Sequence, residues 1–127
     1  LQLREETGLP TPTFGHAADG NFHVHFMYDG KVPEQLVQAE RGVEKLMREV
    51  IRLGGAITGE HGVGLAKSPF LALQHNPAEI NAMRTLKRAL DPADILNPGK
   101  IFEPFRIWKH RPLEVRLPWD KRPKDPA

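Results

Sequence analysis

The spacing of apolar and polar residues predicts one long helix and one half-buried strand. Apolar side chains recur every three or four positions over 33–53, which predicts an amphipathic helix closed by a glycine pair. Over 22–28, apolar residues alternate with polar ones, and a period of two predicts a strand that ends at the 29–30 turn. His23 and His25 then share one face of that strand, roughly 7 Å apart.

Shorter elements are predicted from helix caps and prolines. A glycine in the left-handed conformation ends a helix, a proline pushes the preceding residue out of the helical region, and Asn-Pro-x-Glu resembles a capping box. By these criteria the chain begins within a helix. In chain order we expect the last turn of a helix at 1–7, an extended segment at 9–13, a short strand at 56–58, and helices at 68–75 and 77–90.

The composition fits one modest domain with a buried core. Leu, Ile, Val and Phe make up 33 of the 127 residues, which is too many for a disordered chain. No apolar run reaches the roughly 18 residues of a membrane span, and residues 1–15 lack the pattern of a secretory leader, so we expect neither. Because the chain has no cysteine, disulfides, thiolate metal sites and cysteine nucleophiles are excluded. Any metal must use histidine and carboxylate ligands.

The positive charge is concentrated at the C-terminal end. Residues 100–127 hold 8 basic and 4 acidic side chains, although the whole chain carries only +2. Such a segment with two tryptophans could contact nucleic acid. Five prolines within it argue against a recognition helix, so we expect no nucleic-acid partner.

Chemistry-bearing side chains cluster in two glycine-rich stretches, 15–25 and 59–62, which hold four of the six histidines. Glycine lets a backbone turn tightly or approach a ligand closely, and imidazole and carboxylate are the metal ligands left when thiolate is absent. Two histidines and one glutamate would leave coordination positions open, as a catalytic metal requires. The spacing alone is not a strict zinc motif.

Each of these side chains also has a structural explanation. His16 could be a turn residue, and His23 a hydrogen-bonded histidine of the core. Glu60 could cap a turn with His61 as its partner, and His25 could either line a site or occupy a polar strand position. Asp19 and Asn21 are assigned to the backbone of their own turn.

Three segments, 15–23, 59–64 and 91–100, together resemble the signature segments of one family. In this order they are similar to the C-terminal domain of the FAD-linked oxidases, which include D-lactate dehydrogenase, the glycolate oxidase flavin subunit and D-2-hydroxyglutarate dehydrogenase. The resemblance covers residues 12–102. It implies an α+β fold in which helices flank an antiparallel sheet, a ferredoxin-like substrate or cap domain. Residues 1–102 would be the C-terminal part of that domain, followed by a proline-rich basic tail at 103–127.

The resemblance implies a flavin-dependent dehydrogenase that oxidises a D-2-hydroxy acid of the lactate or glycolate type to the 2-oxo acid. FAD would be bound mainly by an N-terminal domain absent from this chain, so the isolated fragment is expected to be inactive. A divalent metal, usually zinc, would assist the reaction. The implied roles are metal ligands at His16, His23 and Glu60, the catalytic base at His61, a flavin contact at Asn97 and a substrate-facing position at His25.

The resemblance also implies partners and a location, and it leaves alternative functions open. The implied partners are a small 2-hydroxy acid and an electron acceptor, which would be a quinone, a cytochrome or an electron-transfer protein. The implied location is the cytoplasm or the inner face of a membrane, and an open sheet edge would let the fragment form homo-oligomers. The alternatives are a flavin-dependent alkyl transferase or phenol oxidase of the same superfamily, and a free-standing metal-binding module or hydrolase without flavin.

Overall fold

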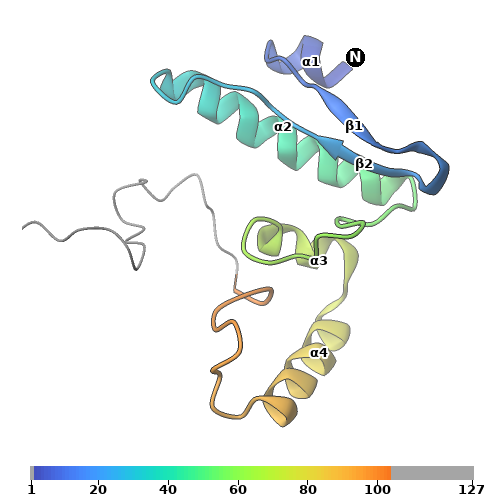
Figure 1. The fold of residues 1–127 in the computed structure, drawn as a ribbon, viewed down its shortest axis with the longest axis vertical. Helices are drawn as coiled ribbons and strands as arrows, with labels where there is room; N and C mark the ends of the chain where they lie inside the picture. Colours follow the sequence, from blue (N-terminus) through green and yellow to red (C-terminus); the bar gives the residue numbers. More distant parts are fainter. Residues whose placement is uncertain (1, 104–127) are drawn as a thin grey trace, which may run out of the picture.

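The computed structural model describes residues 2–103, and these form an α+β arrangement built around one long helix (Figure 1). A two-stranded antiparallel hairpin and α1 lie on one side of α2, α3 lies on the other, and α4 projects away from them. The elements in chain order are α1 (Gln2–Thr7), β1 (Thr13–His16), the 3-10 turn η1 (Ala17–Asp19), β2 (Asn21–Val24), α2 (Pro33–Arg52), the 3-10 turn η2 (Ser68–Phe70), α3 (Leu71–Gln74) and α4 (Pro77–Leu90).

The hairpin is shorter than the alternating pattern predicts. β2 ends at Val24, although the amide of His25 donates to the carbonyl of Pro12 at 3.1 Å and that of Met27 to Pro10 at 2.9 Å. Proline has no N–H to return these bonds, so the pairing beyond Val24 is one-sided. The predicted strand over 22–28 is therefore wrong in its second half.

The core lies between the C-terminal half of α2 and the segment that follows it. Ile57, Phe70 and Leu71 are buried, and apolar side chains of α2 pack on them. The strand predicted at 56–58 is wrong, because the Ile57 amide donates to the side-chain oxygen of Gln74 at 2.9 Å instead of to a neighbouring strand. Ile57 is only 3% exposed, so its burial in the core accounts for an apolar residue at this position without a strand.

The helices are found where the sequence predicts them. α2 begins at Pro33 and ends at Arg52, and the predicted helix at 68–75 is divided into η2 and α3. At the start of α4 the Asn76 side chain accepts hydrogen bonds from the amides of Ala78 and Glu79. The Glu79 carboxylate in turn accepts one from the Asn76 amide. This capping box satisfies amides that have no partner within the helix.

One glycine fixes the distance between the hairpin segment and α2. A Cβ atom at Gly42 would lie 2.4 Å from the Phe26 ring, so the helix can approach the segment after β2 only without a side chain there. Within residues 2–103, no helix has both the length and the apolar character that crossing a bilayer requires. The basic tail predicted at 103–127 lies, apart from its first residue, outside the described residues.

Candidate functional site

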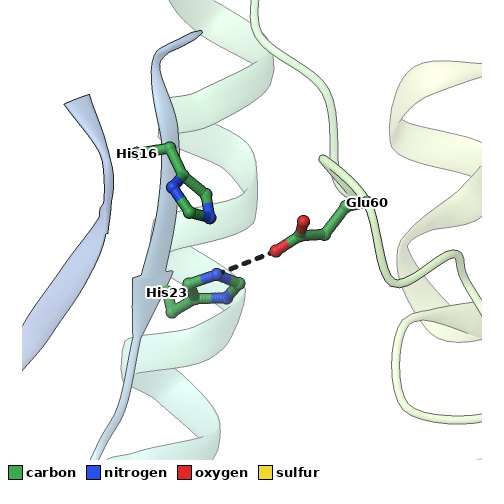
Figure 2. Close-up of side chains that lie close together, drawn as sticks. All are labelled: His16, His23 and Glu60. Atoms are coloured by element: carbon green, nitrogen blue, oxygen red, sulfur yellow. Dashed lines mark ion pairs between the residues drawn. The ribbon is translucent and has the colours of Figure 1, made fainter. Parts of the chain in front are cut away.

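Two histidines of the hairpin and one glutamate of a distant loop converge (Figure 2). His16 ends β1, His23 lies in β2, and Glu60 lies in the loop after α2. Each side chain offers one ligand atom, and these atoms all lie within 4.8 Å of one another. His23 Nε2 is 3.0 Å from Glu60 Oε1. The structure therefore brings together the three residues expected to form a metal site.

The strand register explains why the two histidines meet. His16 pairs with Asn21 across the hairpin, and Asn21 precedes His23 by two residues. Side chains two apart share a strand face, and diagonal neighbours across a pair are within reach of long side chains. The imidazole rings accordingly lie 6.4 Å apart between centroids, almost perpendicular to each other.

Two glycines bring the backbone close enough for this convergence. A Cβ atom on Gly59 would lie 2.2 Å from Asn21 Oδ1, so the loop that carries Glu60 packs directly on the Asn21 side chain. Asn21 thus helps to place Glu60 opposite His23. Sequence reasoning assigned Asn21 only to its own turn, because nothing in the local pattern shows that a loop almost forty residues later packs on it.

Gly15 is the second glycine, and its replacement gives a testable prediction. Its φ is +153°, and a Cβ atom there would lie 2.2 Å from the carbonyl oxygen of Asn21. Gly15→Ala should force the hairpin apart and destabilise the protein by at least about 2 kcal/mol. Thermal unfolding measures this loss. Gly30→Ala is the matched control, because Gly30 has nothing within 4 Å of the added atom; equal stability of both variants would contradict the prediction.

His61 and His25 lie near this cluster. The His61 ring is 5.0 Å from the His23 ring, and its Nε2 is 3.5 Å from Glu60 Oε1. The side chain of His61 is 70% exposed. The Phe14 ring lies 5.1 Å from the His23 ring and 5.2 Å from the His25 ring. Both imidazoles therefore lie beside the same ring, although His25 follows the end of β2.

One hollow of about 750 Å³, here called the site hollow, is lined by His23, His25, Glu60 and His61 but not by His16. Apolar side chains of α2 form part of its wall, and Lys67 also lines it. Lys67 is not among the site residues predicted from the sequence. A signal existed, since Lys67 is the one lysine or arginine between Arg52 and Arg84.

Asn97 lies apart from the other candidates. It lines a second hollow of about 390 Å³, beside α4, together with Lys87 and Asp91. Asn97 has a φ of +51°, in the left-handed region that asparagine tolerates better than most residues. The structure therefore does not place Asn97 in the lining of the site hollow.

Asp91 organises the loop that carries Asn97. Its carboxylate accepts from the amides of Ile95 at 3.0 Å and Leu96 at 2.9 Å, and it pairs with the ammonium of Lys87. The Lys87 contact, aided by the two amides, holds the pKa of Asp91 below its ordinary value. The same contact raises the pKa of Lys87.

These shifts predict that acid loosens the loop. A carboxylate whose pKa is lowered by folding stabilises the fold above its unfolded pKa, and this contribution disappears as the pH falls through the folded value. Protection of the Ile95 and Leu96 amides from hydrogen exchange should therefore be constant near neutral pH and fall below about pH 4. The raised pKa of Lys87 preserves the pair up to the alkaline range. Asp91→Asn should abolish the acid-dependent step, and a step that persists in this variant would assign it to another group.

Comparison with known proteins identifies the family. The family model described as FAD linked oxidases, C-terminal domain, matches residues 2–101. The chain belongs to this family, and its α+β fold agrees with a fragment of that domain. The match includes both histidines of the hairpin, the 59–62 loop and Asn97.

Two of the individual relatives are named as an oxidase subunit and a dehydrogenase. The chain is 46% identical over 90 residues to the glycolate oxidase subunit GlcD of Bacillus subtilis, covering 71% of this chain and 19% of that protein. It is 45% identical over 97 residues to the mitochondrial cytochrome D-lactate dehydrogenase of Kluyveromyces lactis, covering 76% of this chain and 16% of that protein. The chain thus spans less than a fifth of the length of these relatives.

Proposed function

We propose that this chain is the substrate-holding part of a flavin-dependent dehydrogenase that oxidises a D-2-hydroxy acid of the lactate or glycolate type. The observation that carries the proposal is the convergence of His16, His23 and Glu60 beside the exposed imidazole of His61. Membership of the FAD-linked oxidases supports the redox chemistry. The relatives named as glycolate oxidase subunit and D-lactate dehydrogenase support the substrate class.

The three converging side chains fit a divalent metal. Two imidazole nitrogens and one carboxylate oxygen suit zinc and its neighbours, and three protein ligands leave room for a substrate oxygen. Atoms that bind one zinc ion at roughly 2.0–2.2 Å in tetrahedral geometry lie roughly 3.3–3.6 Å apart. The three ligand atoms lie within 4.8 Å of one another, so small side-chain movements would bring them to this spacing. A metal held by these residues would polarise the substrate hydroxyl and lower its pKa.

The remaining side chains of the site hollow then have distinct roles. His61 accepts the hydroxyl proton on an imidazole nitrogen. FAD, when bound, would supply the acceptor for the hydride that leaves the carbon bearing the hydroxyl. Glu60 and His61 are adjacent in sequence, so one loop supplies both a metal ligand and the base. His25, which also lines the site hollow, faces the substrate in this proposal. Asn97, on a separate loop, is proposed to contact the flavin.

The electron acceptor and the FAD-binding part lie outside this chain in our proposal. A quinone, a cytochrome or an electron-transfer protein would reoxidise the flavin. Residues upstream of this sequence in the native polypeptide would hold most of the dinucleotide, because the 59–64 glycine segment lacks the spacing of a dinucleotide-binding loop.

Anaerobic titration of the full native polypeptide tests the proposal. The visible flavin spectrum is recorded while D- and L-2-hydroxy acids are added, before and after chelation of metals. We expect bleaching by a D-acid, loss of bleaching after chelation, and recovery when a divalent metal is restored. A flavin that is indifferent to every acid and to chelation would favour the alkyl transferases or phenol oxidases instead, and a colourless polypeptide would favour a metal module.

A further inference from the structure

Lys67 is held on a rigid backbone at the wall of the site hollow. Its amide donates to the carbonyl of Val63 at 3.1 Å, and its carbonyl accepts from the amide of Phe70 at 3.0 Å. The next residue, Ser68, is buried, and its hydroxyl donates to the carbonyl of Leu65 at 2.8 Å. The backbone position of Lys67 is therefore fixed by the turn that leads into η2, and Lys67 is one of the residues that line the site hollow.

The ammonium of Lys67 has no counter-ion in the described part of the chain. No carboxylate among residues 2–103 lies within ion-pair distance of it, whereas Lys45 pairs with Glu6 and Lys87 with Asp91. Partial burial lowers the pKa of Lys67. A half-buried positive charge without a partner is unfavourable, and an anion that enters the hollow would relieve this cost.

We propose that Lys67 binds the carboxylate of the acid that occupies the site hollow. This inference rests on the proposed function for the identity of that acid. A 2-hydroxy acid carries its carboxylate one bond from the carbon that is oxidised, so a single hollow can hold its charged end on Lys67 and its hydroxyl end near His61. Lys67 then distinguishes an acid from its ester or amide, because only the acid supplies a negative charge.

The test compares a charged ligand with its uncharged counterpart in the full native polypeptide. Calorimetry measures the binding of pyruvate, a 2-oxo acid, and of pyruvamide, which has the same carbon skeleton without the charge. Lys67→Met should weaken pyruvate binding at least tenfold and leave pyruvamide binding unchanged, as loss of a charge-assisted hydrogen bond requires. Lys67→Arg should restore most of the affinity for pyruvate. Lys31→Met, at an exposed lysine outside the hollow, is the matched control.

The outcomes separate this inference from the proposed function. If Lys67→Met weakens pyruvate binding selectively but the wild type oxidises no 2-hydroxy acid, Lys67 keeps its role and the proposed function fails. If the wild type oxidises an acid and Lys67→Met binds pyruvate normally, the proposed function stands and the inference is overturned. Failure of the wild type to bind pyruvate, or equal weakening of pyruvate and pyruvamide binding, would also overturn it.

Discussion

Replacing His23 with glutamine is expected to abolish binding of the proposed metal and to lower the proposed dehydrogenase turnover of the native polypeptide by about a thousandfold or more. His23 contacts Glu60, and its ring lies 6.4 Å from that of His16 and 5.0 Å from that of His61. Glutamine retains polar character but loses the imidazole nitrogen that zinc prefers. The loss of metal assistance costs several kcal/mol of transition-state stabilisation, which corresponds to a rate factor of about a thousand.

Metal content by mass spectrometry and turnover of a D-2-hydroxy acid are measured together. His75→Gln is the matched control, because His75 lies at the end of α3, pairs with Glu79 and is absent from the lining of the site hollow. This variant should keep both metal and activity. A His23→Gln protein with a full complement of metal would remove His23 from the ligand set, and unchanged turnover without metal would show that the reaction does not need it.

The helices could be predicted because their signals are local. The capping box at Asn76 and the proline at the start of α2 act within one turn of the helix they begin. The strand at 56–58 could not be judged in the same way. A strand requires a neighbour, and Ile57 meets the Gln74 side chain instead. The apolar signal of Ile57 therefore reports burial and not secondary structure.

The ligand types of the candidate site could be predicted from the sequence, but the contacts that hold these residues in place could not. Residue types and spacing suggested histidine and carboxylate ligands, and the family resemblance supplied the roles of His16, His23 and Glu60. The contact between Asn21 and Gly59 and the position of Lys67 depend on how the loop after α2 folds back on the hairpin. No periodicity within either segment encodes that contact.

His61→Ala should stop the acid from reducing the flavin while flavin and metal both remain bound. His61 neighbours the cluster of ligand atoms without belonging to it, so its removal should leave the metal site intact. General-base catalysis contributes about a hundred- to ten-thousandfold, and the rate of flavin bleaching in a stopped-flow experiment should fall by that factor. Metal content and the visible flavin spectrum of the resting protein should equal those of the wild type.

Added imidazole distinguishes a lost base from a damaged site. Because the His61 side chain is 70% exposed, its deletion leaves a space that solvent and a small base can enter. Millimolar imidazole should therefore restore part of the bleaching rate in His61→Ala. It should have no such effect on His23→Gln, which is expected to have lost the proposed metal. Flavin reduction at the wild-type rate by His61→Ala without imidazole would exclude His61 as the base. The next candidate would be Glu60, whose Oε1 lies 3.5 Å from Nε2 of His61.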